Sequence, residues 1–442
     1  MVQAGVILAF AALLILSMKG VRLHIVMFIA TAIMALTSGL EAGEALSVIW
    51  RSFTDKATCE LAAAVLSIGL FSTIMQATGF LDRAVEGLTA LLGNVKAALM
   101  AVPALVGTMP VLGGAALSAP LVDKLGRPLG LGPDQKAAIN LVFRHGMFFV
   151  FPFSTSLILT SKLTGFSVPR LIAKMWPMSL ALWGVGYFAL LHKAPAGHHA
   201  SFGRDEKGAR EASATLSGDP NVGERAGQAG ALVSGESRGK TRLDGLREFL
   251  IYGGPLLLAL AFGMALSLPL WLALTGGMAI ALALALWQKR PLPPRDMLLK
   301  GANLSQVVAM FWIMAFRSFV EMAPVFRDLV DKATAAGIPT ALLAILLPLA
   351  FGYANASQQA TLSVLVPIFV PSSGSEAIRL GLTSLIYGSS FTSYFFSPLH
   401  MCQILTCQYY NVSLQDVYKR NWPVLVGFLV VLGVFYLAVP RL

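Results

Sequence analysis

Charged residues are scarce in this sequence. Asp, Glu, Lys and Arg together make up 12% of the 442 residues, against about 25% in soluble domains. Hydrophobic residues reach 56%, above the roughly 45–50% of soluble domains. A water-soluble protein of this length cannot cover its surface with so few charges, which excludes a soluble enzyme with one core. The composition predicts an all-α polytopic protein that lies in a lipid bilayer.

Cysteine is rare as well, and several catalytic motifs are missing. Cys59, Cys402 and Cys407 form neither a disulfide framework nor the spacing of a metal site, so no metal and no cofactor is expected. The sequence lacks the Gly-x-x-x-x-Gly-Lys loop of an ATP-driven pump and the His-Glu-x-x-His motif of metalloproteases. No Gly-x-Ser-x-Gly elbow surrounds Ser118 or Ser390, which argues against a serine hydrolase.

Apolar runs make up most of the chain. Two of the apolar regions, 96–163 and 338–407, are interrupted by Gly, Pro and polar residues. The first run has no charge before Lys19 and is expected to be a retained helix rather than a cleaved signal peptide. A span of the roughly 30 Å hydrocarbon layer needs about 20 residues. Runs of about this length occupy residues 4–19, 22–39, 58–79, 172–191, 248–264, 267–288, 302–322 and 421–439.

One hydrophilic segment divides the chain. Residues 192–247 are rich in Ser, Gly, Glu and Arg, and such a composition cannot bury enough apolar surface to fold. We expect a disordered cytoplasmic linker between a first half at 1–191 and a second half at 248–442. The adjacent His198 and His199 fit a solvated linker better than a metal site.

The two halves resemble each other in sequence. Trp176-Pro177 aligns with Trp422-Pro423, and at the same offset Pro152 aligns with Pro398. Further upstream, Gly107 aligns with Gly352 at an offset that differs by one residue. Identities at Leu or Ala count for little, but the aligned prolines and the constant register predict an internal repeat.

The charge distribution favours inverted repeats. The net charge is +11, from 33 basic and 22 acidic residues. In a membrane protein, an excess of basic residues indicates which loops lie in the cytoplasm, rather than nucleic-acid binding. If 96–124 and 338–371 are re-entrant hairpins, each half crosses the membrane five times, with the amino terminus outside and the linker in the cytoplasm. Full crossings would put the basic loop at 289–300 outside, against the positive-inside rule.

The interrupted segments should hold the solute site, because non-helical backbone survives at membrane depth only inside protein or along a wet cavity. Broken helices also aim amide groups and a positive dipole end at an anion. The glycines have an alternative role in close helix packing. The candidate solute-binding residues in the two hairpins are Thr108, Gly113, Gly114 and Ser118 in the first, and Asn355, Ser357, Gln358 and Gln359 in the second.

Each half also contains a long helix with a break, and only the first carries an arginine. Arg144 lies in apolar sequence and must face a partner or a cavity. It is a candidate counter-charge for an anion, since guanidinium binds carboxylate bidentately; the alternative is a structural ion pair with Glu60 or Glu321. The candidates in these broken helices are Asn140, Arg144, Ser154, Thr155, Ser389, Ser390, Thr392 and Ser393.

Two histidines are candidates for ion coupling. His145 and His400 lie in the broken helices, and imidazole titrates near neutral pH, so either is a candidate proton carrier. Both also fit the commoner role of a hydrogen-bonded core residue. Arg317 and Glu321 have the i,i+4 spacing of a structural ion pair. Sodium held by freed carbonyl groups is the other coupling ion that the sequence leaves open.

The pattern resembles the ion transporter superfamily, which includes permeases for gluconate, citrate and C4-dicarboxylates and the arsenite-type pumps. The stretches from Leu112 to Pro120 and from Asn140 to His145 resemble more specifically an uncharacterised integral-membrane family, domain of unknown function 401. The likeness covers nearly the whole chain except the linker. It implies a homodimer with a scaffold and a moving, elevator-like transport domain. The first hairpin has Gly113-Gly114 where the dicarboxylate branch has a Ser-Asn-Thr tip, so ligand positions from that branch do not carry over.

The sequence thus predicts a secondary active transporter in the cell inner membrane. Its substrate would be a small organic anion, such as a carboxylate, that moves with H⁺ or Na⁺ between inward- and outward-open states. The alternatives are a passive channel, which saturable and gradient-coupled uptake would exclude, and an intramembrane hydrolase, which a serine-directed covalent probe would reveal.

Overall fold

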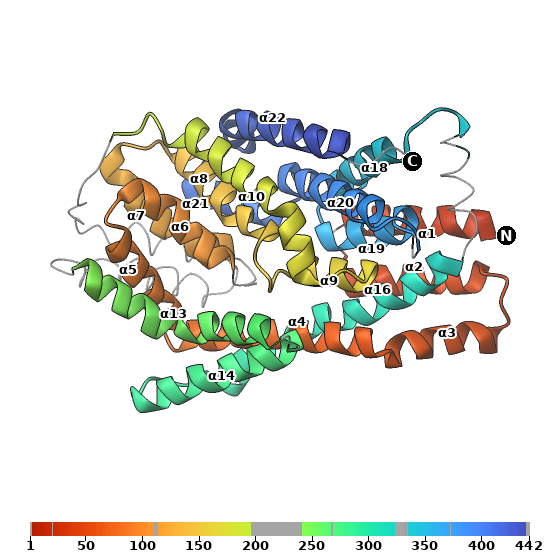
Figure 1. Cartoon of the computed structure of the whole chain (residues 1–442), viewed down its shortest axis with the longest axis horizontal. Helices are drawn as coiled ribbons and strands as arrows, with labels where there is room; N and C mark the ends of the chain where they lie inside the picture. Colours follow the sequence, from red (N-terminus) through yellow and green to blue (C-terminus); the bar gives the residue numbers. More distant parts are fainter. Residues whose placement is uncertain are drawn as a thin grey trace.

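The chain forms a helical molecule whose helices run mostly along its long axis (Figure 1). The computed structural model describes residues 2–19, 21–108, 114–195, 241–266, 268–322, 332, 335–371 and 373–438, and these ranges contain no strand. By length and composition, five helical segments in them are able to cross a membrane: Lys56–Ala77, Arg242–Gly263, Leu270–Trp287, Arg295–Val320 and Leu414–Leu437.

Both halves of the described chain consist of helices. The first half contains α1 (Val2–Met18), α2 (Leu23–Thr37), α3 (Ala42–Thr54), α4 (Lys56–Ala77), α5 (Phe80–Leu92), α6 (Val95–Gly107), α7 (Gly114–Gly126), η1 (Arg127–Leu129), α8 (Pro133–His145), η2 (Gly146–Phe149), α9 (Thr155–Thr164) and α10 (Val168–Leu190). The second half contains α13 (Arg242–Ala265), α14 (Leu270–Trp287), α15 (Arg295–Gly301), α16 (Leu304–Met322), α18 (Thr340–Asn355), α19 (Gln358–Phe369), α20 (Glu376–Phe396), α21 (Met401–Tyr410) and α22 (Leu414–Ala438). Helices α9 and α21, for example, are both 10 residues long and each follows a break.

The structure has short helices that the sequence analysis did not predict, and one of its long helices starts earlier than predicted. Helices α3 and α5 were not predicted, because each is short and amphipathic and carries charge along one face. The predicted linker ends at residue 247, but α13 already begins at Arg242. A capping box explains the early start, since the Thr241 side chain accepts from the Asp244 amide and the Asp244 side chain accepts from the Thr241 amide. Residues 196–240 of that linker lie outside the described residues.

Helices next to the breaks pack against helices of the other half. Helices α6 and α7 pack against α8, and α7 and α8 also pack against α21 of the second half. In the same way α18 and α19 pack against α20, and α19 packs against α9 of the first half. Figure 1 shows the first group towards one end of the long axis and the second group towards the other. Helices α10 and α22 pack on each other and contact both α8 and α20.

A buried ion pair joins α7 to α8. The Lys136 ammonium lies 2.5 Å from one oxygen of Asp123, and Arg127 donates to the other oxygen of that carboxylate. Lys136 and Asp123 are both buried. Buried charges require such pairing, so this contact fixes α7 on α8 beside the broken region.

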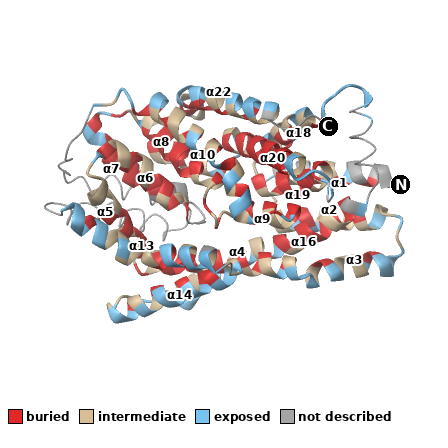
Figure 2. Ribbon diagram, in the orientation of Figure 1, coloured by how far each residue is buried: buried red, intermediate tan, exposed pale blue. Residues whose placement is uncertain are grey.

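Burial separates an inner from an outer set of helices (Figure 2). In α20 every residue from Leu380 to Ser393 is buried, which is typical of a helix enclosed on all sides. Large apolar side chains such as Trp50, Trp287 and Trp422 are instead exposed on outer helices. An apolar exterior around a buried polar interior suits a bilayer environment.

Candidate functional site

The first helix break lies inside the molecule, between α8 and α9. Helix α8 ends at His145, η2 makes one tight turn, and the chain continues through a non-helical segment to Ser154. The Tyr387 hydroxyl donates to the Phe148 carbonyl at 2.7 Å, and the Ser179 hydroxyl donates to the Gly146 carbonyl at 2.7 Å. These bonds satisfy backbone groups that the break removes from the helix ladder.

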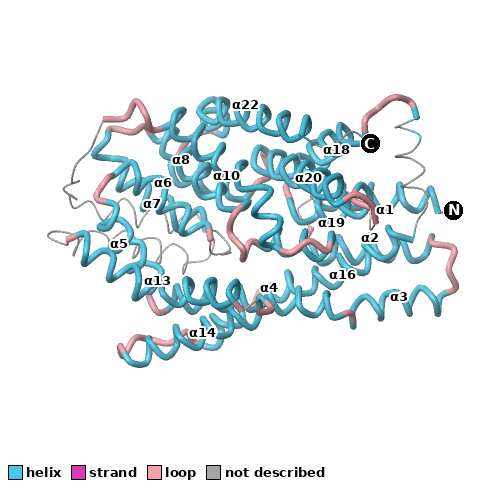
Figure 3. The backbone as a smooth tube through the Cα atoms, in the orientation of Figure 1, coloured by secondary structure: helices cyan, strands magenta, loops and turns pink. Residues whose placement is uncertain are grey.

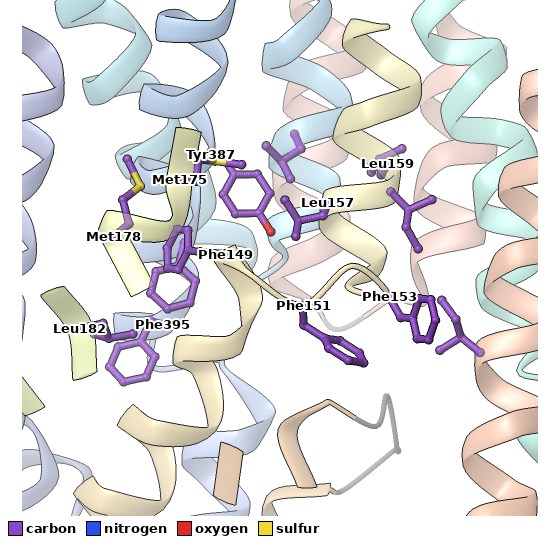
Figure 4. Close-up of a cluster of buried hydrophobic side chains, with 14 of the residues drawn as sticks. Phe149, Phe151, Phe153, Leu157, Leu159, Met175, Met178, Leu182, Tyr387 and Phe395 are labelled. Atoms are coloured by element: carbon purple, nitrogen blue, oxygen red, sulfur yellow. The ribbon is translucent and has the colours of Figure 1, made fainter. Parts of the chain in front are cut away.

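Aromatic packing holds this break in place. Figure 4 shows Phe149 and Tyr387 beside the segment that leads to Phe151 and Phe153. The Phe149 ring lies 4.6 Å from Phe391 and 5.6 Å from Tyr387, measured between ring centroids. These ring contacts hold the backbone of the break against α20. Loop segments are visible in the middle of the molecule as well as at its ends (Figure 3).

The second break has the same kind of support. Helix α20 ends at Phe396 and α21 begins at Met401. The Tyr418 hydroxyl donates to the Phe396 carbonyl at 2.7 Å, and the Ser397 hydroxyl donates to the Tyr353 carbonyl at 2.7 Å. A tyrosine thus satisfies a carbonyl at each break.

The tip of the second hairpin starts a helix at the cavity described below. Helix α18 ends at Asn355, and Ala356 has a left-handed conformation with φ +50°. The Ser357 hydroxyl then accepts from the Ala360 amide at 3.2 Å and caps α19. The positive end of α19, with Gln358 and Gln359 in its first turn, therefore borders the cavity.

The first hairpin tip is described only in part. Helix α6 ends at Gly107, Thr108 follows it, and α7 begins at Gly114. Residues 109–113, with the predicted site residue Gly113, lie outside the described residues, as does the side chain of Asn355 in the second tip.

A cavity of about 290 Å³ lies where the breaks and the second tip meet. Eight of the predicted site residues line it, from four separate stretches of chain. They are Thr108, Arg144, His145, Ser154, Thr155, Ser357, Gln358 and Gln359. The structure therefore brings predicted residues from both halves together at one cavity.

Arg144 contributes the positive charge of this cavity. Its residue is 6% exposed, and its guanidinium lies beside the Cys402 thiol and the Tyr394 hydroxyl. Of the two predicted structural partners, Glu60 pairs with Lys162 at 2.5 Å, and the Glu321 side chain lies outside the described residues. The described residues that line the cavity include no Asp or Glu.

The two side-chain amides at the start of α19, those of Gln358 and Gln359, differ in their hydrogen bonds. Gln359 donates to the Thr155 hydroxyl at 2.6 Å, so it joins α19 to α9. Gln358 is 3% exposed, and its amide lies near the Tyr387 hydroxyl but makes no hydrogen bond of ordinary geometry among the described residues. An unsatisfied buried amide costs about 1–3 kcal/mol, which makes Gln358 available to a polar solute.

The two histidines lie together next to Arg144. The His145 and His400 rings are 4.9 Å apart between centroids and nearly perpendicular. His145 lines the cavity, and its Nδ1 lies 2.7 Å from the Leu141 carbonyl. His400 is buried behind it, with its ring 4.0 Å from that of Tyr394.

Other predicted site residues do not line the cavity. Helical serines and threonines often donate to carbonyls of the preceding turn, and this explains Ser390, which bonds to Tyr387, and Thr392, which bonds to Gly388. Asn140 donates instead to the Thr406 hydroxyl at 3.2 Å. The remaining members of this group are also buried away from the cavity: Ser118 in α7, Ser389 in α20, and Ser393, which donates to the Pro348 carbonyl.

Several lining residues were not predicted. Asn303 and Gln306 come from the start of α16, where the sequence pattern gives no sign of which face meets the cavity. Gln306 donates to the Gln359 amide oxygen at 3.4 Å. The other lining residues are Tyr394 and Cys402, five residues at the first break, and one residue at each hairpin tip: Met147, Phe148, Phe151, Phe153, Ser156, Gly107 and Ala356.

The close approach of α6 to α8 gives a first testable prediction. A Cβ added to Gly107 would lie 2.5 Å from the Arg144 carbonyl oxygen, so Gly107→Ala must push α6 and Arg144 apart. We expect a loss of about 1–2 kcal/mol in stability and weaker solute binding. Gly184→Ala is the matched control, because nothing lies within 4 Å of its added Cβ. Equal melting temperatures for the two variants in detergent would contradict this prediction.

Comparisons with known proteins place the chain in a family. The model of the family described as "Protein of unknown function (DUF401)" matches residues 4–201 and 233–439. The search of curated proteins found no match. A solved structure, the YdaH transporter of Alcanivorax borkumensis, is similar in fold, with a TM-score of 0.52, 14% sequence identity and 89% of each chain covered. The family match confirms the resemblance seen between Leu112 and Pro120 and between Asn140 and His145: the chain belongs to the DUF401 family.

Proposed function

We propose that this protein is a secondary active transporter of a small organic anion, with a carboxylate as the most fitting substrate class. The observation that carries the proposal is the cavity at the two helix breaks, which combines Arg144 with the amide of Gln358 and a row of hydroxyls. A guanidinium grips a carboxylate through two parallel hydrogen bonds, and amides and hydroxyls then fix its orientation. The fold shared with a protein titled a transporter supports the same function.

We propose further that the two halves are inverted repeats. A short helix follows a break in each half, and each of these helices packs on the other half, α21 on α7 and α8 and α9 on α19, which supports this view. Inverted repeats give inward- and outward-open states of similar energy around one central site. The hairpins and broken helices would move as an elevator-like unit against a scaffold, as in the ion transporter superfamily that the sequence resembles.

The proposed setting is the cell inner membrane, with the amino terminus outside and the linker in the cytoplasm. The assembly would be a homodimer. His145 or His400 would carry a coupling proton, or freed carbonyls would hold Na⁺. A channel needs an open path, whereas this cavity is bordered by packed aromatic residues such as Phe151 and Phe153, which favours alternating access.

Uptake into liposomes tests the function. Purified protein would be reconstituted and offered a panel of radiolabelled mono-, di- and tricarboxylates, with sodium and pH gradients imposed separately. We expect saturable uptake of at least one carboxylate, accelerated by one of the two gradients. Uptake that grows linearly with concentration would instead indicate a channel, and neither binding nor uptake of any carboxylate would contradict the proposal.

A further inference from the structure

Three potential metal ligands converge at the inner wall of the cavity. His145 at the end of α8, His400 before α21 and Cys402 in its first turn place their ligand atoms within 4.8 Å of one another. His145 and His400 are buried and Cys402 is partly buried. We propose that these three side chains form a binding site for a zinc-class transition-metal ion.

The imidazole hydrogen bonds suit this role. The Leu141 carbonyl can only accept, so His145 donates to it from Nδ1 and keeps a lone pair on Nε2. In His400 the Nδ1 side faces the Phe395 carbonyl at 3.5 Å. Its Nε2 is buried with no hydrogen-bond partner among the described residues. Metal-binding histidines commonly have this arrangement, with one ring nitrogen on a backbone carbonyl and the other on the metal.

The donor set selects the class of ion. Two imidazoles and one thiolate favour Zn²⁺ and similar ions over Na⁺ or Mg²⁺, which prefer oxygen ligands. Tetrahedral zinc holds such atoms about 3.3–3.8 Å apart, so shifts of roughly 1 Å would close the site. Metal binding deprotonates the thiol, and the negative sulfur then offsets the positive charge of Arg144, which lies beside it.

The site would keep one coordination position open. His145 and Cys402 both line the cavity, so a fourth ligand has to come from that side. Three protein ligands with an open fourth position are typical of zinc sites that bind water or a solute. The ion would thus lie next to the proposed anion site. With the ion bound, His145 and His400 could not carry a coupling proton, so Na⁺ would be the coupling ion.

Cobalt spectroscopy tests the site on the full-length purified protein. The protein in detergent, stripped with chelator and kept reduced, would be titrated with Co²⁺, which shows a thiolate-to-cobalt charge-transfer band when sulfur binds it. We expect this band with one ion per chain, and its loss on addition of Zn²⁺. Cys402→Ser should abolish the band, and His400→Gln should weaken Co²⁺ binding by about 100-fold or more.

Two controls separate this site from others. Cys407→Ser changes another cysteine of α21, and the double change His198→Ala with His199→Ala removes the linker histidines; both should leave the band unchanged. Gel filtration establishes that each variant is folded. A wild-type protein with no band, or a band that survives Cys402→Ser, would overturn the proposal. Because the readout is metal binding alone, a negative result leaves the anion-transport proposal standing, and the reverse holds too.

Discussion

Replacement of Arg144 by Gln is expected to lower the affinity for the transported anion by about 100-fold or more. Arg144 is 6% exposed and lines a cavity without acidic residues among the described part of its wall. Truncating one member of a buried, hydrogen-bonded charge pair costs about 2–5 kcal/mol, and about 2.7 kcal/mol corresponds to 100-fold. The loss should appear in equilibrium binding as well as in the concentration for half-maximal uptake.

Arg144→Lys should recover only part of this loss. Lysine keeps the charge but offers no planar pair of donors for a carboxylate. The matched control is Arg170→Gln, which removes an arginine whose side chain is 59% exposed in a pair with Glu376. Exposed pairs contribute about 1 kcal/mol at most, so this variant should transport normally. Unchanged affinity in Arg144→Gln would remove Arg144 from the site.

Replacement of Gln358 by Leu is expected to weaken binding of the anion and to raise the stability of the folded protein. The Gln358 amide is buried and makes no hydrogen bond of ordinary geometry among the described residues, with only the Tyr387 hydroxyl near it, so an apolar side chain of similar size should raise stability by about 1 kcal/mol. The same change removes a donor and an acceptor from the cavity wall. We expect binding of the anion to fall by about 10- to 100-fold.

Gln403→Leu provides the contrast. Gln403 is also buried and its side-chain oxygen has no hydrogen-bond partner among the described residues, but its amide nitrogen donates to the Phe395 carbonyl. The residue does not line the cavity. Its loss should lower the melting temperature instead of raising it. If Gln358→Leu lowered the melting temperature like Gln403→Leu and bound the anion normally, Gln358 would be a structural residue.

The apolar pattern predicted the long helices and the positions of the helix breaks. Breaks marked by Pro152 and Pro398 do lie where the chain leaves and re-enters helix, since proline cannot continue a helix ladder. The amphipathic helices α3 and α5 escaped prediction because a search for uninterrupted apolar runs passes over them.

Side-chain roles were harder to predict than helices. In an apolar helix, the hydroxyl of a residue such as Ser390 or Thr392 can donate a hydrogen bond to a carbonyl of the preceding turn. The sequence alone does not show whether such a hydroxyl makes this bond or contacts a solute. Asn303 and Gln306 reach the cavity through the packing of α16 on α19. The approach of His145 to His400 likewise depends on tertiary contacts, which sequence spacing does not reveal.

The location of the bound anion tests the central proposal most directly. Crystals grown with a bromine-substituted analogue of a transported carboxylate would show the bromine by anomalous scattering. We predict an anomalous peak inside the cavity, with the carboxylate of the analogue within hydrogen-bond distance of Arg144 and Gln358. A saturating analogue bound elsewhere on the protein, with the cavity free of it, would contradict the proposal.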